Sequence, residues 1–232
     1  MTTMPGPQLP VSSPAALLRT EIPVWPLFWR ILLAGIGHLF IVPSPWTTTM
    51  LYKFLVEHTV LPDSRRLKFT GQPGDIWYLI IAIAALSWLH EAASHAGVHR
   101  TAGLLGPVIA AYLTVLVYRW VCANVKSEDG RLDLSFGGEP LAYVGWTLLL
   151  ILSIVTIIGW AWVAKFMMRW ICRNVQGTLQ FDFTATGWQI LWRVLVFGLL
   201  NILIIPIPWT IRWFTSWMIS QVSVAPSPAE AA

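Results

Sequence analysis

Two distant segments of the chain share one pattern of hydrophobic and polar positions. The segment "LFWRILLAGIGHLFIVPSPWT" (residues 27–47) aligns without a gap with "ILWRVLVFGLLNILIIPIPWT" (residues 190–210), at an offset of 163 residues. Each is an apolar run that ends in Pro-x-Pro-Trp. Proline lacks a backbone donor and blocks the continuation of a helix. Each segment therefore predicts an apolar helix, called helix A here, that stops at this motif and is followed by a second helix, helix B.

The same unit occurs four times along the chain. "RWVCANV" (residues 119–125) returns as "RWICRNV" (residues 169–175), and the copies lie about 47 to 50 residues apart once an insertion of 17 residues in the second copy is removed. Repeats of this kind bury a hydrophobic face only against their neighbours. We therefore predict one domain, in which the first unit packs on the last. It covers residues 20–222, with units at residues 20–65, 66–130, 131–178 and 179–222.

Short alternating segments that end in glycine open three of these units. They read "RLKFTG" (residues 66–71), "RLDLSFGG" (residues 131–138) and "LQFDFTATG" (residues 179–187). This alternation is typical of strands. Gly159 stands in the third unit where the first and fourth have the first proline, and glycine is the weaker breaker. It predicts a kink there rather than a full break.

The composition changes the expected surroundings of these helices. The 232 residues are 56% hydrophobic and only 11% charged, with a mean hydropathy of +0.64, whereas an ordinary soluble domain has about 25% charged residues. A helix crosses a bilayer with about 20 apolar residues. The predicted fold class is an all-α membrane protein with four internal repeats. Each repeat consists of helix A, a Pro or Gly break and a Trp-rich helix B, and short strand-like cytoplasmic links join the repeats.

Both ends of the chain differ from this repeated domain. Residues 1–19 have no basic segment followed by a long apolar core, so they predict a disordered segment rather than a cleaved signal peptide. Residues 223–232 form a Pro/Ala tail that predicts disorder. The positive-inside rule puts basic links in the cytoplasm, which predicts a multi-pass protein with both termini cytoplasmic. The basic residues around the links are Arg65, Arg66, Lys68, Lys126, Arg131 and Arg173.

One segment carries a family resemblance. "YKFLVEHTVLPDSRRLKFTG" (residues 52–71), together with the Pro-Trp upstream, resembles the YjgN-like family of bacterial inner-membrane proteins. That family has repeated units of Phe-x-Gly, an apolar helix, Pro-Trp and a polar helix end. This chain departs from the family in its insertion and in its third unit, which lacks Pro-Trp. The resemblance implies a bacterial inner-membrane location and no known enzyme activity, and it supplies no catalytic residues.

Two matched pairs of polar residues lie within the apolar helices of the first and last units. Arg30 matches Arg193, and His38 matches Asn201. The arginines either extend to the lipid headgroups or converge on an anionic lipid or substrate headgroup. The His38 and Asn201 side chains either contact each other across the bundle or line a translocation path. These four residues are the predicted ligand-binding set.

The insertion contains the densest polar cluster, "LHEAASHAGVHRTAG" (residues 89–103). On a helix, Glu91, His95 and His99 would share one face, and a carboxylate with two imidazoles can hold zinc or another divalent ion. The alternatives are a solvated elbow and a cap that responds to pH through histidine protonation. No other cofactor is expected. The sequence contains no phosphate-binding glycine loop, nucleophile elbow or nucleic-acid module.

Three functional hypotheses remain open at this stage. The first is a non-enzymatic inner-membrane protein that binds or moves a lipid or small amphiphile, since repeats with polar groups between helices are a common transporter plan. The second is a structural or accessory subunit of a larger membrane complex. The third is a metal-dependent membrane enzyme that uses Glu91, His95 and His99. The expected partners are membrane lipids, and other membrane subunits or a second copy of the chain.

Overall fold

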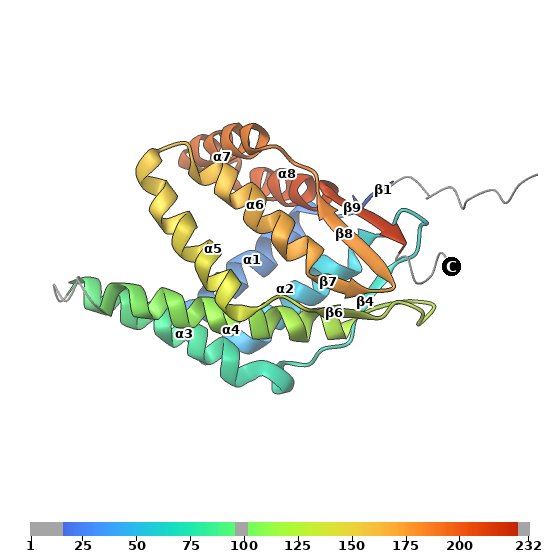
Figure 1. Ribbon diagram of the computed structural model, residues 1–232, viewed down its shortest axis with the longest axis horizontal. Coiled ribbons are helices and arrows are strands. Elements are labelled where there is room, and N and C mark those ends of the chain that lie inside the picture. The colour runs from blue at the N-terminus through green and yellow to red at the C-terminus, as the bar shows by residue number, and fades with distance from the viewer. Residues whose placement is uncertain (1–15, 96–101, 227–232) are drawn as a thin grey trace, which may run out of the picture.

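One order of elements, strand, helix, helix, strand, occurs four times in the computed structural model, which describes residues 16–95 and 102–226 (Figure 1). The first unit contains β2 (Arg19–Thr20), α1 (Val24–Leu39), α2 (Ser44–Glu57) and β3 (Thr59–Val60). The second contains β4 (Leu67–Phe69), α3 (Pro73–His95), α4 (Ala102–Asn124) and β5 (Val125–Ser127).

The third and fourth units follow the same order. The third contains β6 (Leu134–Phe136), α5 (Pro140–Ser153), the 3-10 turn η1 (Ile154–Thr156), α6 (Trp160–Arg173) and β7 (Val175–Gly177). The fourth contains β8 (Leu179–Phe183), α7 (Gly187–Ile202), α8 (Ile207–Ser220) and β9 (Val222–Pro226). A short strand, β1 (Ala16–Leu17), precedes the first unit.

The prediction of an all-α fold is wrong, because the strand-like links are halves of antiparallel strand pairs. In every unit the opening strand, before the helices, pairs with the closing strand, after them: β2 with β3, β4 with β5, β6 with β7 and β8 with β9. The added strand β1 pairs with β9, which gives a three-stranded sheet in the order β1-β9-β8. The sequence predicts disorder for residues 1–19 and 223–232, whereas residues 16–17, 19 and 223–226 lie in these strands.

The predicted multi-pass membrane bundle is not supported either. Within the described residues, one helix segment, Leu105–Asn124, is long and apolar enough to cross a membrane. The other apolar segments, including α1 and α7, have 10–17 residues. At 1.5 Å per residue such an apolar segment is at most about 26 Å long, shorter than the roughly 30 Å of hydrocarbon in a bilayer. In the first, third and fourth units the Pro and Gly breaks end the apolar helices, and in α3 the apolar segment ends at Leu89, before polar residues.

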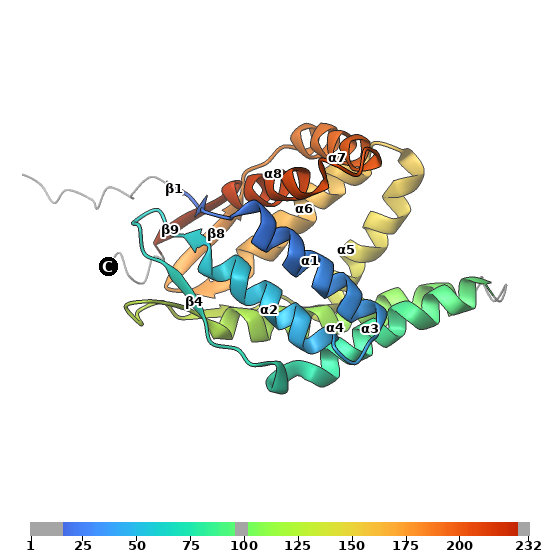
Figure 2. The same ribbon diagram turned by 180° about the vertical axis from the view of Figure 1, so that it is seen from behind.

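Within the described residues, helices α1 to α8 form a closed ring. Each helix packs on the next one along the chain, and α8 packs on α1, so that the first and last units meet as the repeat predicts. The opening strand of each unit also packs on the second helix of the unit before it, and β2 packs on α8 in the same way. The strands gather toward the right of Figure 1 and the helical pairs extend from them toward the left; Figure 2 shows the ring from behind.

A phenylalanine of the opening strand is buried against the second helix in three units. Phe69 packs edge-on against Trp120, with ring centroids 5.2 Å apart, and Phe136 packs against Trp170 at 6.0 Å. Two residues later comes Gly138, where a Cβ would lie 2.4 Å from Phe136 and 2.8 Å from Trp170. The Phe-x-Gly spacing is thus a packing requirement, because a side chain at the glycine would occupy the space of the aromatic pair.

A backbone hydrogen bond closes each unit at the base of its helices. The carbonyl at the end of the second helix accepts the N–H of the residue that follows the opening strand. The bonds run from Glu21 to His58 (3.0 Å), Thr70 to Asn124 (3.0 Å), Gly137 to Asn174 (2.8 Å) and Thr184 to Gln221 (2.9 Å). The polar residue at this place in each repeat therefore ends the helix and joins it to the strand pair.

The turn between the two helices has the same strained backbone in three units. Ile41, Ile157 and Ile204 have φ values of 60°, 64° and 59°, a region that β-branched residues rarely adopt. Each lies at the centre of a three-residue γ-turn, whose hydrogen bond is 2.6 to 2.7 Å long. The prediction of a kink at Gly159 is wrong, because the 3-10 turn η1 and the γ-turn at Ile157 separate α5 from α6, and the two helices pack on each other as a pair. We call residues 40–43, 154–159 and 203–206 the tip turns.

The packing around Gly138 predicts a large difference between two glycine substitutions. Gly138→Ala should lower the free energy of unfolding by about 1–3 kcal/mol, because the new methyl group overlaps Phe136 and Trp170. Gly145→Ala is the control, since Gly145 lies within α5 with no atom near its Cβ position. This change should raise stability by up to about 1 kcal/mol. Thermal unfolding measures both, and equal shifts would show that Gly138 is not tightly packed.

Candidate functional site

The two matched arginines each stack on aromatic rings within their own unit. The Arg30 guanidinium lies 4.2 Å from the ring centroid of Phe54, and that of Arg193 lies 4.3 Å from Trp217. Phe54 and Trp217 occupy the same place in the first and fourth units. Arg193 also lies 4.5 Å from Trp192. These cation–π contacts stabilise each helical pair, and they hold the two arginines in separate units.

The second matched pair, His38 and Asn201, is also divided between units. The Asn201 side-chain oxygen accepts a 2.9 Å hydrogen bond from the hydroxyl of Thr210, which lies on the other helix of the same pair. The His38 carbonyl accepts a 3.4 Å bond from the indole of Trp88 on α3. His38 thus belongs to the groove between the first and second units, and Asn201 to the fourth.

His38 lines two cavities. Of the predicted ligand-binding residues, His38 therefore leads to the candidate site. One cavity, of about 340 Å³, lies between α1 and α3 and is lined by His38, Ser87, Trp88, Glu91 and neighbouring small or apolar residues. Neither Arg30, Arg193 nor Asn201 lines it. A largely apolar cleft with a few polar groups is the usual form of a small-ligand site.

The other cavity at His38, of about 120 Å³, opens toward α2 and α4. Its polar groups come from Thr48 and Tyr52 of α2 and from Thr114 of α4. None of these three residues belongs to the predicted ligand-binding set. The only sequence signal is the spacing of Thr48 and Tyr52, which puts both on one face of α2, and Thr114 joins them only because α4 packs beside this groove.

The predicted metal site stays a prediction. Among residues 16–95 and 102–226, no three His, Cys, Asp or Glu side chains lie close enough together to hold a metal ion. Glu91 lines the larger His38 cavity, but His99 lies outside the described residues. The described part of the chain therefore does not contain the complete set of ligands.

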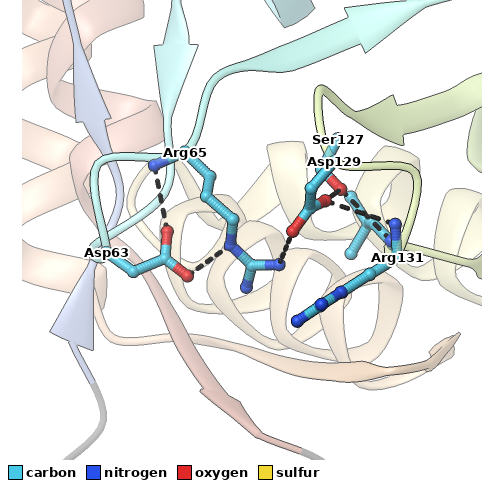
Figure 3. A network of polar contacts seen from close by, with 6 residues as sticks. Asp63, Arg65, Ser127, Asp129 and Arg131 are labelled. Carbon is cyan, nitrogen blue, oxygen red and sulfur yellow. Dashed lines mark hydrogen bonds and ion pairs between the residues drawn. The ribbon is translucent and has the colours of Figure 1, made fainter.

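A polar network joins the loops at the strand end of the first two units (Figure 3). Arg65, between β3 and β4, donates to Asp63 at 2.5 Å and to Asp129 at 3.1 Å. Asp129 follows β5 and also accepts hydrogen bonds from the Ser127 hydroxyl and from the backbone N–H of Arg131. These contacts fix two exposed turns against each other. Because each carboxylate accepts several donors, we interpret the network as structural.

The network changes the titration of Asp129. The hydrogen bonds from Ser127 and Arg131, and then the charge of Arg65, lower the pKa of this carboxyl from 3.8 to about 2. A carboxyl with a lowered pKa in the folded protein contributes stability that is present above its ordinary pKa and is lost as the pH falls. For Asp129 that loss lies between about pH 4 and pH 2.

Comparison with known proteins gives no match for this chain among protein-family models, characterised proteins or solved structures.

The titration of Asp129 leads to a test of the network. Asp129→Asn should lower the unfolding temperature at neutral pH, and the difference from the natural protein should shrink as the pH falls from about 4 to 2, because the Asp129 carboxyl becomes protonated over this range, first in the unfolded chain and then in the folded protein. Thermal unfolding between pH 2 and 7 measures this. Glu128→Gln is the control, since it removes an acid from the same exposed turn. A difference that is as large at pH 2 as at pH 7 would contradict the assignment.

Proposed function

We propose that the protein is inserted into a membrane by its tip turns and binds a lipid or small amphiphile there, without chemistry of its own. The observation that carries this proposal is the exposure of large apolar side chains at all three tip turns. Ile157 is 80% exposed and Ile205 is 82% exposed. Others that are exposed there are Phe40, Val42, Ile154, Val155, Ile158, Leu203 and Ile204. Contiguous apolar surface of this kind marks membrane or protein contacts.

The distribution of charge also supports an orientation in which the tip turns lie in the membrane and the strands lie outside it. The segments 40–50, 150–164 and 199–211, which include the tip turns, contain no ionisable residue. At the opposite ends of the helices, ion pairs join residues in or beside the strands, such as Lys126 with Asp133 and Arg173 with Asp182. One end of the molecule therefore suits hydrocarbon and the other suits water and lipid headgroups.

The backbone of the tip turns is also suited to an apolar environment. An unpaired backbone group costs several kcal/mol in lipid, and these turns bond their own groups. The Ser44 N–H and hydroxyl both donate to the Ile41 carbonyl, and the Thr156 hydroxyl donates to Ser153. A positive φ at three matching isoleucines is a local strain. Glycine or asparagine would relieve it, whereas isoleucine adds apolar surface for contact with lipid.

The depth of insertion differs between the helical pairs in this proposal. The short pairs would end within the bilayer, and Leu105–Asn124 of α4 would cross most or all of it. The resemblance to the YjgN-like proteins supports the bacterial inner membrane as the location. The positive-inside rule supports a cytoplasmic position for the strand end, which carries Arg65, Arg66 and Lys126.

A second candidate function, an accessory subunit of a membrane complex, is favoured by the outer face of α1. Trp29, Leu32, Leu33 and Ile36 are exposed there, at the spacing of one helical stripe. Such a stripe fits a partner helix as well as it fits lipid. A partner that co-purifies in fixed ratio and covers this face would favour the second function.

Charged substitutions at the tip turns test the proposal. Ile158→Glu with Ile205→Glu should reduce the fraction of protein that floats with phosphatidylethanolamine/phosphatidylglycerol vesicles by roughly tenfold or more. A charge within the bilayer costs about 2.5 kcal/mol or more even on the mildest scale. Gln176→Glu with Gln180→Glu adds the same charge at exposed strand positions and should float like the natural protein. Equal flotation of both variants would argue against insertion by the tip turns.

A further inference from the structure

One face of α8 lines a cavity of about 470 Å³ near the strand end of the fourth unit. Six of its lining residues lie on α8 and recur at i, i+3, i+4, i+7, i+8 and i+11, which is the pattern of one helix face, and Thr20 of β2 lies beside them. The six are Trp209, Arg212, Trp213, Ser216, Trp217 and Ser220. The lining therefore combines one cation and three hydroxyls with three indole rings. This cavity lies away from His38, which belongs to the groove between α1 and α3.

A second cavity, of about 340 Å³, continues toward the tip turn of the same unit. Trp209 and Trp213 line both cavities, and the second is completed by Val196, Leu200, Pro206 and Thr210. The hydroxyl of Thr210 already donates to Asn201 and Ile207. The second cavity is therefore almost wholly apolar. Two indole rings thus separate a polar cavity near the strands from an apolar one near the tip turn.

The charge of Arg212 is not balanced by a carboxylate within the described residues. Its Nε donates to the carbonyl of Ile22 at 2.7 Å, which leaves the terminal nitrogens of the guanidinium for another acceptor. Glu21, the acid nearest in sequence to this contact, forms its ion pair with Arg66. A guanidinium fork that is anchored at one nitrogen and free at the others is suited to a carboxylate or phosphate group.

Arg193 packs against two of the indole rings that line the polar cavity, on the side away from the cavity. This arginine stacks on Trp217 at 4.3 Å and lies 6.0 Å from Trp213, and both rings line the cavity. Its buried Nε has no hydrogen-bond partner. Arg193 is thus a positioning residue for the two indoles, and it does not itself line the cavity.

We propose that these two cavities form one binding site for an amphiphile with an anionic headgroup. The headgroup binds Arg212 and the hydroxyls of Thr20 and Ser216, and the chain passes Trp209 and Trp213 into the apolar cavity between α7 and α8. Indole rings favour this boundary between polar and apolar surroundings. The inference rests on the proposed membrane function and names the ligand class and the place where it binds.

Titration of the purified protein with single lipids, read by native mass spectrometry, tests the site. The probes are dioleoyl-phosphatidylglycerol, dioleoyl-phosphatidylcholine with the same chains, and oleate. The natural protein should bind phosphatidylglycerol at least about tenfold more tightly than phosphatidylcholine. Arg212→Gln should weaken that binding by roughly tenfold, as expected for a lost charge-assisted hydrogen bond. Ser216→Leu should abolish it by filling the cavity.

The matched control is Lys165→Gln, which removes one positive charge at the equivalent position of α6 and should bind like the natural protein. If Arg212→Gln unfolds through loss of its bond to Ile22, Ser216→Leu decides, because it leaves that bond in place. Oleate bound with the same dependence on the variants would identify a carboxylate amphiphile, and binding of phosphatidylglycerol alone would identify a phospholipid. Both support the site.

Two results would overturn the site. One is phosphatidylglycerol binding that is unchanged in Arg212→Gln and Ser216→Leu, and the other is equal binding of phosphatidylcholine. Neither result bears on the vesicle flotation experiment, which tests membrane insertion by the tip turns separately. A protein that floats with vesicles through its tip turns but binds neither anionic probe would retain the membrane attachment and lose the proposed site.

Discussion

The pairing of the opening strand with the closing strand of each unit determines the rest of the structure. Since the two strands meet side by side, the two helices between them must run outward and return over the same length. The helices of a pair accordingly have 16 and 14 residues in the first and fourth units and 23 each in the second. An insertion that lengthened only one helix would break the strand pair. The insertion in the second unit is shared between both helices, and the register of β4 on β5 is kept.

Contacts from one unit to the next join these four pairs into a ring. Arginines on the second helices donate to carbonyls of the following unit: Arg119 to Gly138 and Arg169 to Phe183. Arg212, one helical turn earlier on its helix than those two arginines, makes an analogous contact across the junction, to Ile22 of the first unit. One of the contacts at this junction is therefore made by a residue that also lines the proposed amphiphile site, beside the packing of α1 on α8 and the pairing of β1 with β9. A ligand bound as proposed would share this guanidinium with the contact to Ile22.

The repeat, the helix breaks and the approximate helix positions follow from the sequence, because Pro-x-Pro and the matched apolar runs act locally. The strand pairs do not follow from the sequence. Closing strands such as Val125–Ser127 are too short to show an alternating pattern, and they pair with residues more than fifty positions away in the chain. Convergence of Arg30 and Arg193, one of the two alternatives for these residues, is not supported, for a reason that lies in the ring itself. Residues that match between repeats occupy equivalent places around a ring, and equivalent places are apart. The site at Arg212 needs β2 beside α8, a contact that exists only after the ring closes.

The helical pair of the second unit, α3 and α4, is longer than the other pairs and makes the ring asymmetric. With 23 residues against 14 to 16, α3 and α4 extend about 10 Å beyond the other helices. In a ring of four pairs, this tall pair stands opposite the fourth unit, which contains the two cavities at Arg212. Within a bilayer, α3 and α4 would insert more deeply than the other helices, and this difference would determine the tilt of the molecule. The apolar cavity between α7 and α8 would then lie at a fixed depth in the lipid leaflet and open in a fixed direction.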